Sequence, residues 1–133
     1  MNQQHLLHKE LTKEILATFF QVHYELGYGF NESVYSKAMA YALEDVGIKT
    51  KREVPTIVHF RGREVGRFRA DHVVETSVLL ELKVGIGLPE GTTAQVLNLL
   101  RASKIEVGLI LHFGLKPKFQ RLIYTNDRKL LPV

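Results

Sequence analysis

The stretch from Phe68 to Val84 contains Asp71, Glu81 and Lys83 within two segments that are rich in β-branched and apolar residues, as is typical of β-strands. A polar segment in its middle, residues 75–77, predicts a turn that joins two strands. Because side chains alternate between the faces of a strand, Glu81 and Lys83 point to one face and their apolar neighbours point to the other. Pairing about the turn would bring Asp71 level with or diagonal to Glu81, within reach of one shared ion.

This combination of charges has a chemical interpretation. Two carboxylates a few ångströms apart repel each other unless a proton or a cation lies between them, and hard oxygen ligands suit Mg²⁺ or Mn²⁺. Alternatively, Asp71, Glu81 and Lys83 form the solvated face of a half-exposed antiparallel sheet, in which Lys83 pairs with Glu81. The spacing alone leaves both interpretations open.

Length and composition limit the possible classes of protein. The 133 residues are 45% hydrophobic and 24% charged, which predicts one globular domain over residues 1–133. The absence of cysteine excludes disulfides, thiol nucleophiles and cysteine-bound zinc, and fits a reducing compartment. There is no apolar run of membrane-spanning length, and the polar N-terminus does not resemble a signal peptide. We therefore expect a cytoplasmic protein without a membrane partner.

The charge balance favours a polyanionic partner. Lysine and arginine exceed the acidic residues to give a net charge of +4 and a pI near 9.4. Basic residues gather in three places, where they could contact phosphates or merely keep the surface soluble: Lys49, Lys51 and Arg52; Arg61, Arg63, Arg67 and Arg69; and Lys116, Lys118 and Arg121.

Hydrophobic periodicity predicts the order ααβββαββ, an α/β (mixed α+β) fold. The expected helices cover residues 4–26, 31–46 and 92–103, and the expected strands cover residues 53–60, 64–74, 78–84, 107–113 and 119–125. The near-continuous apolar run at 107–113 is typical of a central strand, parallel to an earlier one. Pro55 indicates an edge strand or a strand start, and Gly66 a bulge or a close approach of the backbone.

The helices place further candidate residues. Asn31 is expected to cap the second helix, which puts Glu32 in its first turn, where a surface acid near the helix dipole is the alternative to a site residue. We expect two sets of inward-facing residues: Val34, Ala38, Tyr41, Ala42 and Val46 on the second helix, and Ala94, Leu97, Leu99 and Leu100 on the third.

Short motifs on these elements resemble a known family. Gly29 to Tyr35 matches the G-x-x-E-x-x-Y signature of the small GxxExxY proteins, which look like members of the PD-(D/E)xK nuclease superfamily. The resemblance continues in order over nearly the whole chain, through Gly66, Asp71 and Val74; Glu81-Leu82-Lys83 as E-x-K; Ala94, Gln95 and Asn98 as A-Q-x-x-N; and Gly108 to Gly114 as the terminal strand motif.

The resemblance implies a restriction-endonuclease-like core, in which a central mixed sheet of about five strands is flanked by helices. It further implies an Mg²⁺ (or Mn²⁺) site formed by Asp71, Glu81 and the carbonyl of Leu82, which Glu32 joins directly or through water. Lys83 would serve the attacking water, and Gln95 would orient the site. The chain departs from the family pattern at three positions, where Ala70 replaces proline, Leu99 an aromatic residue and His112 asparagine.

The implied function is hydrolysis of phosphodiester bonds in nucleic acid, with DNA favoured over RNA. The alternatives are a catalytically weak nucleic-acid-binding or assembly module that keeps the fold, and a hydrolase of small phosphoesters. A domain of this size offers little surface for recognition, so a homodimer or a protein partner could supply specificity. Tyr35 could belong either to the site or to the core. His5 and His8 are expected to be solvated.

Overall fold

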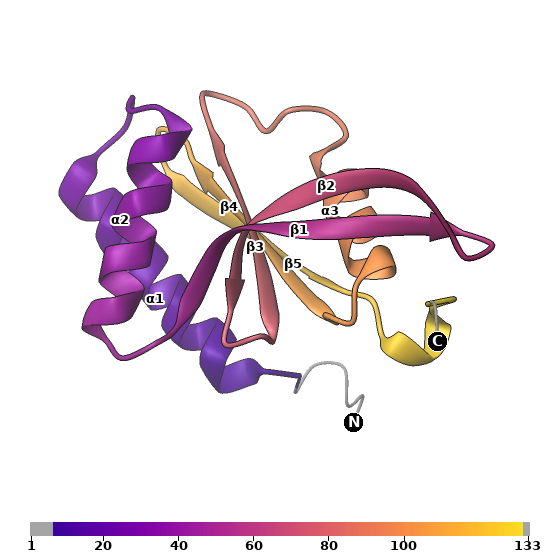
Figure 1. Ribbon diagram of the computed structural model, residues 1–133. Helices are drawn as coiled ribbons and strands as arrows, with labels where there is room; N and C mark the ends of the chain where they lie inside the picture. Colours follow the sequence, from indigo (N-terminus) through magenta and orange to yellow (C-terminus); the bar gives the residue numbers. More distant parts are fainter. Residues whose placement is uncertain (1–6, 132–133) are drawn as a thin grey trace.

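The computed structural model describes residues 7–131 and has the predicted order of elements (Figure 1). The helices are α1 (Lys9–Leu26), α2 (Glu32–Asp45) and α3 (Thr92–Ala102), with a short 3-10 turn, η2 (Asn126–Arg128), near the C-terminus. The strands are β1 (Thr50–Phe60), β2 (Arg63–Val74), β3 (Val78–Val84), β4 (Val107–Phe113) and β5 (Pro117–Ile123).

The five strands form one mixed sheet in the order β1-β2-β3-β4-β5. Only β3 and β4 are parallel neighbours, while the other three pairs are antiparallel. Every residue of β4 is buried, as the apolar run predicted, and Pro55 lies on the edge strand β1, where its missing N–H breaks no inner ladder.

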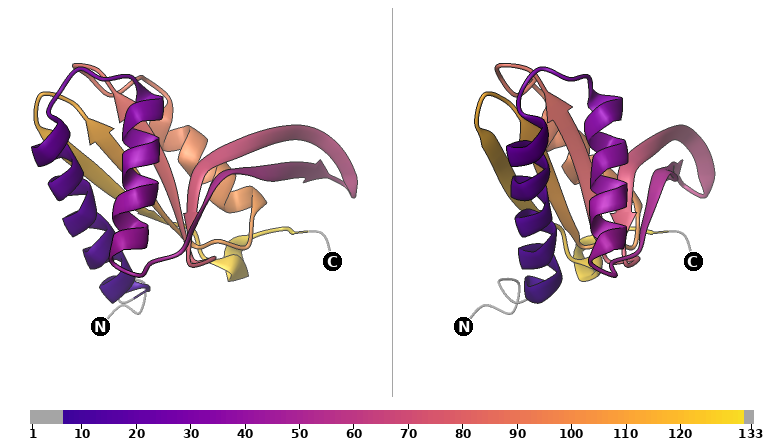
Figure 2. Two further views of the ribbon diagram at one scale, coloured as in Figure 1. Left: turned by 60° about the vertical axis from the view of Figure 1, so that its left-hand side comes forward. Right: turned by 90° about the vertical axis from the view of Figure 1, so that its left-hand side faces the viewer.

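The helices cover the two faces of this sheet (Figures 1 and 2). Helices α1 and α2 lie together over one face, where Phe19, Tyr35 and Leu82 belong to the larger apolar core. Helix α3 covers the other face, where Leu79 and Leu100 belong to a second core. The sheet is therefore buried on both sides at β3 and β4, and a charged residue on either face of β3 is close to protein rather than open water.

The predicted buried faces of two helices were partly wrong. On α2, Tyr41 and Val46 are 69% and 60% exposed, and the buried face is formed by Tyr35, Ser36, Met39 and Leu43. Helix α2 has apolar residues on two faces. Hydrophobic periodicity detects both faces but does not show which of them the neighbouring elements cover. On α3, Ala94 is exposed and Leu97 only partly buried, whereas Val96, Leu99 and Leu100 are buried.

Strands β1 and β2 continue beyond the sheet as a long hairpin arm that curves on the same side as α3 (Figures 1 and 2). Strand β2 pairs with β3 only from His72 to Val74. Arg61 and Gly62, both with positive φ, form the turn at the tip of the arm. The register shifts opposite Val58 and His59, which leaves Val65 as an extra residue beside Gly66, so the bulge predicted near Gly66 is present.

Several element ends differ from the sequence-based bounds. Helix α1 begins at Lys9, after His8 in a left-handed conformation, and β5 begins two residues earlier than expected. The expected start of the first helix and His5 lie outside the described residues. No helix in residues 7–131 is long and apolar enough to cross a membrane.

Candidate functional site

The candidate site forms where β2 separates from β3. The register of the β2–β3 pair places Asp71 level with Glu81, as the sequence predicted, but the paired residues end at His72 and Leu80. In place of a backbone partner, the Asp71 Oδ2 atom accepts a hydrogen bond of 2.7 Å from the Leu82 N–H. The N–H and C=O groups of a strand residue point to the same edge, so the Leu82 carbonyl also faces this gap.

Glu81 lies in a setting that disfavours its charged form. Its residue is 4% exposed, and among residues 7–131 its Oε2 atom has no hydrogen-bond partner. Burial and the negative charge of Asp71 raise the pKa of Glu81 from 4.5 to about 8, against the opposing effect of Lys83. Glu81 is therefore largely protonated at neutral pH when no cation is bound, and the solvated-face interpretation is wrong for this residue.

Lys83 points to the same side of β3 as Glu81. Its Nζ atom lies 3.8 Å from Glu81 Oε1, and its side chain is 20% exposed. On the neighbouring parallel strand, His112 is the register partner of Lys83, and its Nε2 atom lies 2.8 Å from the Gly85 carbonyl oxygen. No partner for His112 was predicted from the sequence, and this buried histidine links the ends of β3 and β4.

The first turn of α2 brings Glu32 to the same place. Burial and the charge of Asp71 raise the pKa of Glu32, and the charge of Lys83 lowers it, so all three side chains are close enough to interact. Asn31 caps the helix as predicted, because its side-chain oxygen accepts a hydrogen bond of 3.2 Å from the Val34 N–H.

The segment before α2 is held by Tyr35, which is fully buried. Its hydroxyl group donates a hydrogen bond to the Gly27 carbonyl oxygen and accepts one of 3.4 Å from the Phe30 N–H. Its ring stacks on Phe113 with the ring centroids 4.2 Å apart. Gly29, at φ +115°, takes a conformation that other residues rarely adopt. Tyr35 is thus a core residue that positions the turn leading to Glu32.

A divalent ion fits the residues that meet here. Among residues 7–131, no three His, Cys, Asp or Glu side chains converge closely enough to form a cage by themselves. Mg²⁺, however, is usually held by one or two carboxylates together with waters and substrate phosphates rather than by an all-protein cage. The unpartnered Glu81 Oε2 atom, the acid pair it forms with Asp71 and the Leu82 carbonyl provide hard oxygen ligands of that kind.

A buried polar cluster beside the site was not predicted. His72, which is fully buried, lies 3.0 Å from Ser36 Oγ through its Nε2 atom and 3.1 Å from Thr50 Oγ1 through its Nδ1 atom. Burial and the charge of Arg52 lower the pKa of His72 to about 4, so it is neutral at pH 7. Arg52 in turn donates a hydrogen bond of 3.2 Å from Nε to Ser36 Oγ. The one available signal was Ser36, four residues after Glu32 on the same helical face.

Gln95 is the predicted site residue that the structure does not connect to the acids. It is exposed on the first turn of α3, where it lines a groove with Phe68, and within residues 7–131 its side chain makes no hydrogen bond to Asp71 or Glu81. Its catalytic role stays a prediction, as do the roles of Glu32, Asp71, Glu81, Leu82 and Lys83.

A five-stranded mixed sheet flanked by helices on both faces, with an acid pair and a lysine at the β2–β3 gap, is consistent with a restriction-endonuclease-like fold. The family model described as the PD-(D/E)XK nuclease superfamily matches residues 9–122, and the chain belongs to this superfamily. Nucleases of this superfamily typically use divalent metal ions.

Comparison with curated proteins gives no match. The crystal structure of a protein designated SSO0001 is similar at 16% sequence identity over 96% of this chain and 79% of that one. Its TM-score of 0.40 is too low to support a conclusion about this chain.

Proposed function

We propose that this protein is a metal-dependent nuclease that hydrolyses phosphodiester bonds with Mg²⁺ or Mn²⁺. The observation that carries the proposal is the buried Glu81 carboxyl group beside Asp71, whose raised pKa and unpartnered Oε2 atom mark a place where a cation can replace the Glu81 proton. A structural ion pair would instead satisfy both acids with basic partners, and Lys83 reaches only one of them within 4 Å.

The chain's own residues have separate roles in this proposal. Asp71, Glu81 and the Leu82 carbonyl would hold the ion, and Glu32 would contribute directly or through water. Bound there, the ion would supply positive charge to a phosphate oxygen and lower the pKa of a water. Lys83, 3.8 Å from Glu81, orients the attacking water and stabilises negative charge that develops on the phosphate. Asp71 is kept in place by the Leu82 N–H, and Tyr35 fixes the turn that presents Glu32.

Nucleic acid is the proposed substrate, with DNA favoured over RNA. Three observations support a nucleic-acid substrate: membership of the nuclease superfamily, the net positive charge of the chain, and the exposed arginines of the β1–β2 arm. Two of these, Arg67 and Arg69, pair with Glu64 and Glu53 at 2.9 and 3.8 Å, in contacts exposed enough for a phosphate to compete. Within the superfamily, we propose membership of the GxxExxY proteins, because Gly29, Glu32 and Tyr35 each have a structural role in the turn or the site.

Cleavage of a mixed set of labelled substrates tests the proposal. The set contains single- and double-stranded DNA and RNA, incubated with Mg²⁺ or Mn²⁺ and the full-length protein or its Asp71→Asn variant. We expect the parent protein to cut at least one substrate only when the metal is present, and the variant to be inactive. A parent that binds metal and nucleic acid but cuts nothing would favour the binding-module alternative, and equal cutting by both proteins would remove Asp71 from the mechanism.

A further inference from the structure

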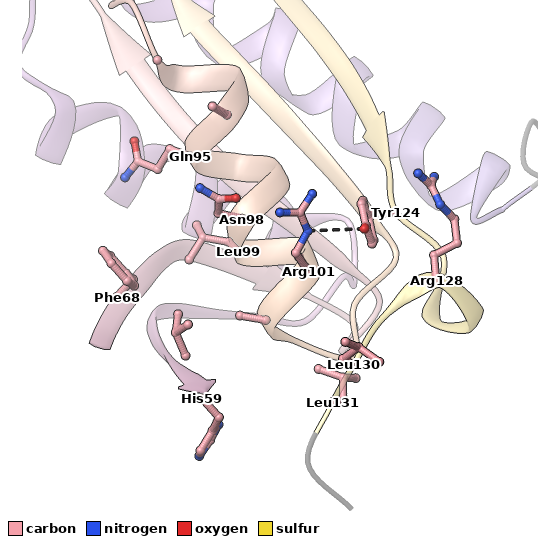
Figure 3. Close-up of a pocket in the computed structure, with 14 residues that line it drawn as sticks. His59, Phe68, Gln95, Asn98, Leu99, Arg101, Tyr124, Arg128, Leu130 and Leu131 are labelled. Carbon is pink, nitrogen blue, oxygen red and sulfur yellow. Dashed lines mark hydrogen bonds between the residues drawn. The ribbon is translucent and has the colours of Figure 1, made fainter. Parts of the chain in front are cut away.

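A groove of about 730 Å³ lies on the outer side of α3, between this helix and the β1–β2 arm (Figure 3). The segment after β5 borders its other side. The residues that matter below are Phe68 from the arm, Gln95, Asn98 and Arg101 from α3, and Tyr124 and Arg128 from the C-terminal segment.

On the arm side, the groove is lined by an aromatic ring, Phe68, that belongs to neither buried apolar core. Phe68 is 51% exposed, although it lies on a strand whose inner end is mostly buried. Its ring passes close to the backbone of Gly66, where an added Cβ atom would lie only 3.2 Å from the ring. Gly66 thus leaves room for the ring in this position. An exposed aromatic ring is suited to stack on a nucleic-acid base.

The α3 side presents two side-chain amides. Gln95 and Asn98 are three residues apart, so they lie on the same exposed flank of the helix. In the described part of the chain neither side-chain amide makes a hydrogen bond. Each amide offers both a donor and an acceptor, which is what the edge of an unpaired base requires.

The far end of the groove is positively charged. The guanidinium groups of Arg101 and Arg128 lie 5.1 and 4.5 Å from the ring centroid of Tyr124, and Arg101 Nε donates a hydrogen bond of 3.3 Å to the Tyr124 hydroxyl group. Within residues 7–131 neither arginine forms an ion pair with a carboxylate. Two cations that are held on one ring and not neutralised are complementary to a phosphate backbone.

The groove and the proposed cleavage site share strand β2. Phe68 precedes Asp71 by three residues on β2, which corresponds to about 10 Å along an extended strand. We propose that the groove binds unpaired nucleotides of a single-stranded segment next to the cleaved bond: Phe68 stacks on a base, Gln95 and Asn98 contact base edges, and Arg101 and Arg128 contact phosphates. The inference rests on the proposed function and narrows its substrate to nucleic acid with a single-stranded part.

Fluorescence anisotropy with single-stranded oligonucleotides tests the groove without requiring cleavage. The probes are labelled thymidine and uridine oligomers of about six nucleotides, mixed with the full-length protein in EDTA. We expect Phe68→Ala to weaken binding about tenfold, since stacking contributes roughly 1–3 kcal/mol per base. The matched control is Tyr24→Ala, because Tyr24 is an aromatic residue 84% exposed on α1, and it should change affinity less than about twofold.

Three results would overturn the inference: no binding of either oligomer by the parent protein, equal affinity of the parent and a folded Phe68→Ala variant, or equally strong competition by a blunt duplex. A melting curve for each variant shows that it is folded. A second variant, Arg101→Gln, removes a charge rather than a ring. It should reduce the slope of log binding constant against log salt concentration by about one, which a packing defect would not do.

The outcomes separate this inference from the proposed function. If binding depends on Phe68 but no substrate is cleaved, the groove binds single strands as inferred and the proposed nuclease activity is wrong. If cleavage depends on metal but binding does not depend on Phe68, the proposed nuclease activity is supported and the inferred role of the groove is wrong.

Discussion

Replacing Lys83 by methionine is expected to lower the cleavage rate about a thousandfold while leaving the fold intact. Methionine keeps most of the side-chain length and removes the charge that lies 3.8 Å from Glu81. Groups that stabilise transition-state charge in a site shielded from water typically contribute 10²–10³-fold to the rate. The rate should fall in single-turnover conditions at saturating substrate, because the proposed contribution is to the chemical step rather than to binding.

The matched control for this variant is Lys13→Met, a lysine exposed on α1 far along the chain from the site. It should cleave at the parent rate. Raising the pH favours ionisation of the neighbouring Glu81 carboxyl group but does not replace the positive charge of the lysine, so Lys83→Met should not regain activity at higher pH. Cleavage by Lys83→Met at the parent rate would exclude the lysine from the mechanism.

The second large effect concerns stability, and its direction is opposite to that of most site variants. Glu81→Gln is expected to raise the free energy of unfolding in EDTA at pH 8. In the unfolded chain the carboxyl group ionises near its ordinary pKa of 4.5, whereas in the folded chain its pKa is about 8. Raising the pH between these values ionises only the unfolded chain, so the stability present below about pH 4.5 is lost as the pH rises toward 8.

The size of this effect follows from the shift in pKa. Each unit corresponds to about 1.4 kcal/mol, so the metal-free parent loses on the order of a few kcal/mol across the interval. Glutamine cannot ionise and can donate to Asp71, so the variant should avoid this loss and melt about 10 °C higher at pH 8. At pH 4 the two proteins should differ little.

Melting curves in EDTA at several pH values, with Glu14→Gln as the exposed control on α1, measure this effect. Adding Mg²⁺ or Mn²⁺ should stabilise the parent and the control but not Glu81→Gln, which lacks a metal-binding carboxylate. If Glu81→Gln is less stable than the parent at pH 8 in EDTA, the folded chain does not disfavour ionisation of the Glu81 carboxyl group, and the prediction is wrong.

Much of the site was predictable because it depends on local rules. A turn at residues 75–77 and the alternation of side chains suffice to place Asp71 level with Glu81, and the observed register agrees. Asn31 followed by a helical pattern was enough to put Glu32 in a first turn. The order of elements, and the parallel pairing of β4 with an earlier strand, followed from the lengths and patterns of the apolar runs; the structure identifies that strand as β3.

The parts that could not be predicted depend on contacts between distant segments. Alternation shows that Glu81 and Lys83 share a face, but the burial of Glu81 depends on a second helical layer covering that face. The contact of Ser36 with His72 joins residues 36 positions apart, and no short pattern encodes it. Ala94 and Gln95 line a groove because the β1–β2 arm lies opposite α3, which strand propensity alone does not imply.

Calorimetric titration of the full-length protein with Mn²⁺ at pH 7 tests the central claim most directly. The account predicts that the parent binds the ion and releases close to one proton from Glu81, measured by comparing buffers of different ionisation enthalpy. Asp71→Asn and Glu81→Gln should bind the ion much more weakly, and Glu81→Gln should release no proton. Mn²⁺ binding that is absent in the parent, or unchanged in both variants, would contradict the assignment of a metal site to these two acids.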